Sequence, residues 1–162
     1  MTETQEAVAV LSASAAAARL RALGAGGRGF LGRDPVTEND SLLARELGRD
    51  DTVVLAVGDT LLGARISRLN PRRAEISASA ADPKALRALA EFLATYRRCF
   101  ALTAVVAEGD PSWPALEELG FTRTAVLRDH WYRTGRYVDG HVLHLATRRP
   151  AAGPSTLEPS CA

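Results

Sequence analysis

The chain has 162 residues, of which 46% are hydrophobic and 24% are charged, and its formal net charge is +1. These values predict one soluble globular domain, over residues 1–148, and give no reason to expect binding of nucleic acid. Cys99 and Cys161 are too few and too far apart to predict a disulfide framework or a metal site. The acidic start, MTETQEAVAV, and the lack of any run of about eighteen apolar residues predict a cytoplasmic protein without membrane contact.

The first third of the chain predicts a short strand followed by two helices. The segment EAVAVLSAS has β-branched residues near its start, and Ser12 or Ser14 can cap the helix AAAARLRAL. That helix should end at GAGGRG, because consecutive glycines impose a large entropic cost on a helix. A second helix is predicted in TENDSLLAREL, with Gly48 as its C-cap.

The middle of the chain changes from strands to a helix. The segment DTVVLAVGDTLLGARISRL predicts an antiparallel hairpin with a Gly-Asp turn, and AEISASA predicts a third strand after the turn NPRR. From Pro83 the apolar residues follow a helical period, with Asp82 placed to cap the helix and Pro83 suited to its first turn. The strand-to-helix junction SAADPKAL contains no glycine.

The last third predicts a buried strand, a short helix and a final hairpin. These are ALTAVVAEG, SWPALEELG, and the strands FTRTAVLRDHWY and YVDGHVLHLAT joined by RTGR. Residues 149–162 are rich in Pro, Ser and Ala and predict a disordered tail. The order of elements predicts an α+β fold, with a mixed, mostly antiparallel central sheet and helices on both faces.

The C-terminal segment SWPALEELGFTRTAVLRDHWYRTGRYVDGHVLHL resembles the end of the GNAT superfamily of N-acetyltransferases. It is most similar to the branch that acetylates the N-termini of ribosomal proteins. The upstream LLGARISRLNPRRAEIS is similar to the paired central strands of that family. The residues that match the C-terminal pattern are Ser112, Leu119, Gly120, Phe121, Leu127, Arg128, Gly135 and Asp139.

The resemblance implies a GNAT fold and transfer of an acetyl group from acetyl-CoA, or another acyl-CoA, to a small-molecule or peptide amine. Two parallel central strands would separate, and the pantetheine arm would pair with the open strand edge at Ser77, Ala78 and Ser79. A base would take a proton from the amine, and an acid would protonate the leaving thiolate. No metal is implied, and a homodimer is possible.

Three positions depart from the family pattern. The glycine-rich loop that binds the pyrophosphate through backbone N–H groups is missing from SAADPKAL, and the shortness of this region indicates a deletion. The Asn three positions before Ser112 is replaced by Gly109, and the tyrosine that many members use as the general acid is Leu116.

Two residues are candidates for acid–base chemistry. The resemblance places Glu75 on a strand facing the substrate cleft, where it would act as the base; the alternative is an ion pair with Arg65 or Arg73. Ser112 would protonate the thiolate or hydrogen-bond the CoA arm. The alternative for Ser112 is the N-cap of the helix PALEEL.

Other candidates have plainer alternatives. His141 and His144 are three apart in a predicted strand, so they should point to opposite faces and not share a metal ion. Trp131 and Tyr132, near the hairpin tip, would line an acceptor pocket or form a dimer contact, or pack structurally. Arg128 and Asp139 are expected to pair across adjacent strands.

Two functions are therefore compatible with the sequence. The leading interpretation is an acyl-CoA-dependent N-acyltransferase, either intact or degenerate. The alternative keeps the same fold without acetyl-CoA chemistry, as a binding or scaffolding partner or as an enzyme for another reaction. The missing glycine loop, and the negative charge of Asp82 at the helix N-terminus where a phosphate would lie, favour the alternative.

Overall fold

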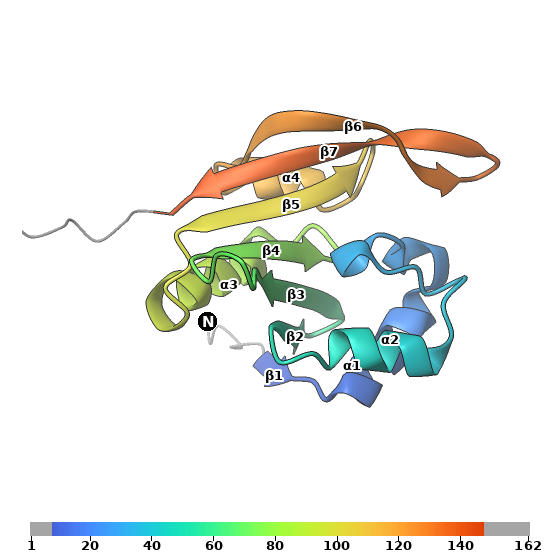
Figure 1. Ribbon diagram of the computed structural model, residues 1–162, viewed down its shortest axis with the longest axis horizontal. Helices are drawn as coiled ribbons and strands as arrows, with labels where there is room; N and C mark the ends of the chain where they lie inside the picture. The colour runs from blue at the N-terminus through green and yellow to red at the C-terminus, as the bar shows by residue number, and fades with distance from the viewer. Residues whose placement is uncertain (1–7, 148–162) are drawn as a thin grey trace, which may run out of the picture.

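The computed structural model describes residues 8–147 and contains a seven-stranded mixed sheet with the order β1-β2-β3-β4-β5-β7-β6 (Figure 1). All neighbouring strands are antiparallel except β4 and β5, which are parallel. The α+β class and the predicted order of strands and helices are confirmed. The expected tail, residues 149–162, lies outside the described residues.

The N-terminal part contains a short edge strand and two helices, linked by a connection with two turns of 3₁₀-helix. Ser12 caps α1 through a hydrogen bond that its Oγ accepts from the Ala15 N–H, at 3.3 Å. The second helix begins later than predicted because Asn39 caps it, with Oδ1 accepting from the Leu42 N–H at 2.8 Å. The elements are β1 (Val8–Val10), α1 (Ala13–Leu23), η1 (Gly24–Gly27), η2 (Phe30–Gly32) and α2 (Asp40–Leu47).

The rest of the chain builds the remainder of the sheet and two more helices. Asp82 caps α3 as predicted, because its Oδ1 accepts a hydrogen bond from the Ala85 N–H at 2.9 Å. The elements are β2 (Thr52–Val57), β3 (Thr60–Ile66), β4 (Arg73–Ala78), α3 (Pro83–Tyr96), β5 (Ala101–Ala107), α4 (Trp113–Glu118), β6 (Thr122–Arg133) and β7 (Arg136–Ala146).

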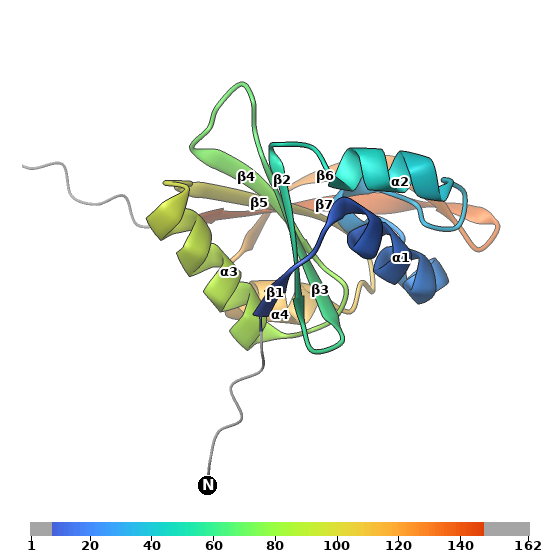
Figure 2. The ribbon, with the colours of Figure 1, turned by 90° about the horizontal axis from the view of Figure 1, so that it is seen from below.

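Two apolar cores lie on opposite faces of the sheet, with α1 and α2 on one side and α3 and α4 on the other (Figure 2). Alternation along β2 divides its side chains between them, so that Val54 and Ala56 pack with α1 and α2 while Leu55 packs with α3. The helices α1 and α2 therefore lie over the N-terminal half of the sheet. Their connection, residues 24–39, is positioned close to β3 and β4.

The parallel strands β4 and β5 separate partway along their length. They pair only over residues 73–75, opposite residues 101–103, so the last paired residues are Glu75 and Thr103. Beyond them, residues 76–78 and 104–107 diverge, as Figure 1 shows. Residues 76–78 remain paired to β3 on their other side. One edge of β4 and one edge of β5 are thus open toward each other.

Candidate active site

A pocket lies where β4 and β5 separate, and five segments of the chain meet there. They are residues 26–30 of the connection between α1 and α2, residues 77–79 at the end of β4, Val105 and Val106 of β5, residues 110–112 before α4, and Trp131 and Arg133 of β6. Its cavity volume is about 20 Å³, which is room for about one water molecule. Five of the residues proposed from the sequence line it: Ser77, Ala78, Ser79, Ser112 and Trp131.

A larger hollow lies elsewhere, between β1, β2, β3 and α3, with a volume of about 420 Å³. Among residues 8–147, its walls are aliphatic and aromatic side chains, and Arg97 is the one charged residue that lines it. The described part of the chain contributes no hydroxyl or carboxylate to this hollow that could move a proton. The smaller pocket, which combines hydroxyls, a carboxylate and guanidinium groups, is therefore the better candidate for chemistry.

The connection between α1 and α2 reaches this pocket because it packs closely on β3. Phe30 and Leu31 lie directly over Gly63, where an added Cβ would be 2.7 Å from Leu31 Cδ1 and 2.8 Å from Phe30 Cζ. Leu31 has a φ of 47°, in the left-handed region, and its carbonyl accepts a hydrogen bond from Arg65 Nη2. Strand β3 therefore fixes the connection through one glycine and one arginine.

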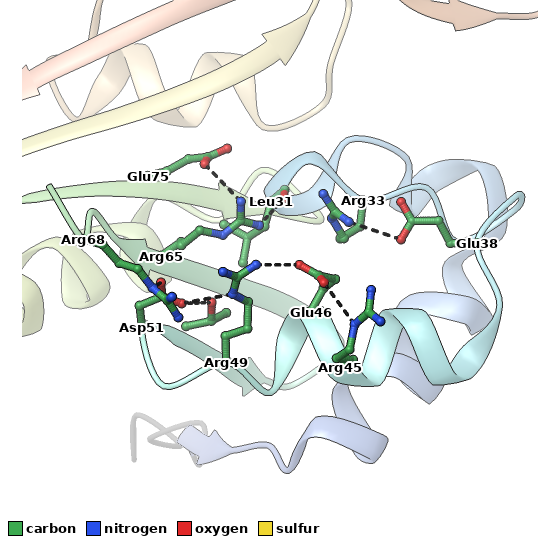
Figure 3. Close-up of polar contacts among 11 residues, drawn as sticks. Leu31, Arg33, Glu38, Arg45, Glu46, Arg49, Asp51, Arg65, Arg68 and Glu75 are labelled. Carbon is green, nitrogen blue, oxygen red and sulfur yellow. Dashed lines mark hydrogen bonds and ion pairs between the residues drawn. The ribbon is translucent and has the colours of Figure 1, made fainter.

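Glu75 lies at the apex where β4 and β5 part, on the same face of β4 as Ser77. It is directed toward Arg65 on β3, whose Nη1 lies 3.8 Å from Glu75 Oε2 (Figure 3). The ion pair that the sequence left as an alternative is therefore present. The side chain of Glu75 is 32% exposed and does not line the pocket itself. Arg65 links this carboxylate to the Leu31 carbonyl and so to the connection.

The end of β4 supplies the residues expected to meet the CoA arm. Ser77 and Ala78 pair with Gly63 and Leu62 of β3, so their free edge is the one toward β5. The Ser79 N–H donates to the Leu61 carbonyl, and Ser79 Oγ accepts from the Leu61 N–H, both at 2.9 Å. The Ser79 hydroxyl therefore holds the end of β4 against β3.

Ser112 is 1% exposed, and its hydroxyl is already engaged. Its Oγ donates to Asp110 Oδ1 at 2.6 Å, and its backbone N–H donates to the same oxygen at 2.9 Å. Ser112 occupies the N-cap position of α4, but its side chain makes no capping hydrogen bond. Sequence reasoning missed Asp110, although Asp followed by Pro and Ser is typical of a turn closed by the Asp side chain.

The aromatic pair from the hairpin tip is divided between two adjoining pockets. Trp131 lines both, whereas Tyr132 lines only the second, together with Arg28, Arg33 and Asp34. Tyr132 is 61% exposed and packs edge-on against Tyr137 of β7. Trp131 carries the Arg133 guanidinium over its ring, 5.3 Å from the centroid. Arg133 was also missed, because an arginine beside a turn looks like solvated surface in a sequence.

A bulge in β6 sets the direction of these side chains. The register between β6 and β7 shifts between Leu127 and Trp131, and Asp129 has a φ of 50°. Asp139 on β7 holds the bulge, because its carboxylate accepts from the Asp129 N–H at 3.0 Å and from Arg128 Nη1 at 2.6 Å. The expected pair of Arg128 and Asp139 is therefore observed. The hydrogen bond from the Asp129 N–H is the main cause that lowers the pKa of Asp139, and Arg128 adds to it.

The histidines do not converge. His141 is buried against Trp113, with ring centroids 4.7 Å apart, and both of its ring nitrogens lack a hydrogen-bond partner. Within residues 8–147 no group of three or more His, Cys, Asp or Glu side chains is arranged to hold a metal ion.

Across the same residues no helix is long and apolar enough to cross a membrane. Cys99 is a free, buried thiol, and burial raises its pKa.

No protein-family model and no curated protein matches this chain. Solved structures do match its fold. Spermidine/spermine N-acetyltransferase SpeG from Vibrio cholerae, in complex with manganese ions, has a TM-score of 0.63 at 18% identity, over 86% of this chain and 91% of that chain. A SpeG chimera with hSSAT gives 0.63 at 16% identity, over 86% and 95%. A probable acetyltransferase gives 0.63 at 17%, over 86% and 91%.

At these identities the likeness establishes architecture. The likeness extends over 86% of this chain, so it concerns the whole arrangement of sheet and helices rather than one motif. The fold class expected from the sequence is confirmed. The chain therefore has the GNAT fold.

Proposed function

We propose that this protein is an acyl-CoA-dependent N-acyltransferase that transfers an acetyl group to an amine. The observation that carries the proposal is the separation of β4 and β5 beyond Glu75 and Thr103, with a polar pocket at its mouth. The matched structures, described as spermidine N-acetyltransferases, support an amine as acceptor. We propose that residues 1–148 form one domain, which can assemble as a homodimer. We further propose that the protein acts in the cytoplasm.

The open edge of β4 would hold the donor. A pantetheine arm carries amide groups that can pair with a free strand edge, and the edge of Ser77 and Ala78 toward β5 has no strand partner. The thioester would then lie between β4 and β5, beside the pocket lined by Ser112 and Trp131. The connection between α1 and α2 would cover the acceptor from the other side.

The transfer requires one base and one acid. The amine nitrogen bonds to the thioester carbonyl carbon as the carbon–sulfur bond breaks, while the amine loses a proton and the thiolate gains one. We assign the base to Glu75, acting directly or through water, because it lies at the apex on the face covered by the connection. We assign the acid to Ser112. To reach the thiolate, the Ser112 hydroxyl must rotate away from Asp110. The Asp110 carboxylate would still accept the hydrogen bond from the Ser112 N–H.

The junction between β4 and α3 does not resemble a phosphate site. Four residues, 79–82, join the two elements, and Asp82 accepts from the Ala85 N–H while Pro83 lacks an N–H altogether. The Asp82 carboxylate would repel a phosphate at this helix N-terminus. We infer that the glycine loop has been deleted, as in a degenerate relative of the ribosomal-protein N-terminal acetyltransferases.

The same observation favours the second candidate function, a GNAT-fold protein that no longer uses acetyl-CoA. Without its cradle, a pyrophosphate would lose several charge-assisted hydrogen bonds at roughly 1.5–3 kcal/mol each. Unless other groups of the protein replace these hydrogen bonds, their loss would weaken CoA binding by orders of magnitude. Such a protein would act as a binding or scaffolding partner or catalyse another reaction.

Calorimetric titration of acetyl-CoA into the full chain separates the two functions. Binding in the micromolar range, followed by release of free CoA when an amine is added, is expected for the acyltransferase. An absence of heat at millimolar acetyl-CoA would contradict it and leave the second function. Dephospho-CoA and pantetheine, titrated in parallel, report how much of the affinity comes from the phosphates.

A further inference from the structure

Arg133 is an unmatched cation at the boundary between the two adjoining pockets. It is the last residue of β6 and lines both pockets. Its guanidinium stacks over Trp131, and its Nη2 donates to the Arg28 carbonyl at 2.9 Å. Its Nε is buried and has no hydrogen-bond partner, and among residues 8–147 no carboxylate lies within ion-pair distance of this guanidinium.

The other charged residues around the two pockets already have partners within the protein. Arg28 Nε lies 3.2 Å from Asp34 Oδ1, and Arg33 Nη1 lies 3.7 Å from Glu38 Oε2. Burial alone would raise the pKa of Asp34, but the Val36 N–H and the Arg28 charge lower it, so this carboxylate stays ionised and bound to Arg28. In the first pocket, the Asp110 carboxylate is held by Ser112. Of the three arginines that line the two pockets, Arg133 is the one with no carboxylate within ion-pair distance among the described residues.

Close packing keeps this arginine in place. Gly29 of the connection has a φ of 88°, and an added Cβ there would lie 3.1 Å from Arg133 Nη2 and 3.6 Å from Trp131 Cζ2. The bulge held by Asp139 fixes the strand from which both side chains project. Arg33 and Arg65 also have a buried Nε without a hydrogen-bond partner, but each has a carboxylate within ion-pair distance. A guanidinium that lines two pockets without such a carboxylate is suited to an external anion.

We propose that Arg133 binds an anionic group, a carboxylate or a phosphate, carried by the acceptor beside its amine. This inference rests on the proposed function and narrows its substrate class. The guanidinium would form charge-assisted hydrogen bonds to the anion, and the Trp131 ring would contact the apolar part of the acceptor. A polyamine, which carries only positive charge, would be repelled by the same arginine.

The test compares matched amines that differ in one anionic group. Acetyl-CoA-dependent acetylation is measured with β-alanine and its amide, with phosphoethanolamine and ethanolamine, and with spermidine. We expect the anionic member of at least one pair to be preferred, with the pair identifying carboxylate or phosphate. Arg133→Gln should raise KM for that acceptor about 10- to 100-fold and leave KM for its neutral partner unchanged. For the same acceptor, the KM of Arg133→Lys should lie between those of the unaltered protein and Arg133→Gln.

Arg136→Gln is the matched control, because Arg136 faces Arg133 across the hairpin, is exposed and lines neither pocket. It should leave all KM values unchanged. Preference for spermidine or for the neutral amines, or an unchanged KM in Arg133→Gln, would overturn the inference while leaving an N-acyltransferase in place.

A binding measurement decides the inference even if no amine is acetylated, a result that would contradict the proposed function. In a Trp113→Phe background Trp131 is the only tryptophan, so its fluorescence reports occupancy of the site. Titration with β-alanine or phosphoethanolamine should change the emission, and Arg133→Gln should abolish the change. No change with either compound would overturn the anion site. If free CoA displaces the bound amine, Arg133 binds the phosphates of the donor. That result would also overturn the inference that Arg133 binds an anionic group of the acceptor.

Discussion

Asp110 Oδ1 lies 2.6 Å from Ser112 Oγ, so the hydroxyl proposed as the acid is held by a carboxylate two residues away. The same oxygen accepts the Ser112 N–H at 2.9 Å and closes the turn before α4. A residue that the sequence did not single out thus determines where a candidate catalytic hydroxyl points.

Removing the Asp110 carboxylate should destabilise the protein. Asp110→Ala leaves the hydroxyl and the N–H of a serine that is 1% exposed without their acceptor, which costs about 1–3 kcal/mol. Ser112→Ala removes only one donor and should cost about 1 kcal/mol. Urea unfolding measures both. Asp50→Ala, an exposed aspartate without a hydrogen bond among the described residues, is the control, and an equal loss there would contradict the assignment.

Glu75→Gln should slow acyl transfer with little loss of stability. A general base typically contributes about 100-fold or more to the rate, so we expect kcat to fall by at least that factor at neutral pH. The pair with Arg65 is long, at 3.8 Å, and partly exposed, so it contributes about 1 kcal/mol or less to folding. Glu108→Gln, an exposed carboxylate just after β5, is the control. A kcat equal to that of the control variant would remove Glu75 from the mechanism.

Gly63→Ala should displace the connection between α1 and α2. The new Cβ would lie 2.7 Å from Leu31 Cδ1 and 2.8 Å from Phe30 Cζ, and both side chains are buried. Overpacking of this kind costs about 1–3 kcal/mol. Gly26→Ala adds the same methyl group where no atom lies within 4 Å, so its melting temperature should stay near that of the unaltered protein. Equal melting temperatures in the two variants would show that the contact is not tight.

Asp51 should make stability depend on pH in the acid range. Burial alone would raise its pKa, but the hydrogen bond from Arg68 Nε at 2.6 Å, the Arg68 charge and the Thr52 hydroxyl lower it (Figure 3). Because the folded pKa lies below the unfolded value of about 3.9, this contribution is present above that pH and is lost as the pH falls through the folded pKa.

The measurement is the free energy of unfolding of Asp51→Asn between pH 7 and pH 2. We expect a shallower loss on acidification than in the unaltered protein, with the two curves approaching each other at low pH. Asp50→Asn should follow the unaltered protein. Parallel curves for Asp51→Asn and the unaltered protein would contradict a lowered pKa.

Asp139→Asn should loosen the β6 bulge. The substitution removes the charge that holds Arg128 Nη1 and the Asp129 N–H, so we expect a lower melting temperature at neutral pH. The lowered pKa of Asp139 means that the difference should shrink as the pH falls through it. Asp129→Asn changes the same charge on the adjacent strand, and the Asp129 side chain makes no hydrogen bond with any of residues 8–147. If Asp129→Asn lowers the melting temperature as much as Asp139→Asn does, the loss comes from the change in charge and not from the hydrogen bonds of Asp139.

Local signals in the sequence determined most of the fold. Ser12, Gly48 and Asp82 cap helices as expected, and the Gly-Asp turn and the alternating strands set the hairpins, because these features depend on neighbours within a few residues. The GNAT fold followed from element order and from the C-terminal pattern.

Only the tertiary structure decided the site. The pocket combines residues 26–30, 77–79 and 110–112 with Trp131 and Arg133, and no sequence period links segments more than 100 residues apart. Arg133 packs against Gly29 and Leu31 against Gly63, and both contacts join residues that lie more than 30 positions apart in the chain. Whether an arginine has a carboxylate partner depends on long-range packing, so the tertiary structure alone decides that Arg133 has none among the described residues.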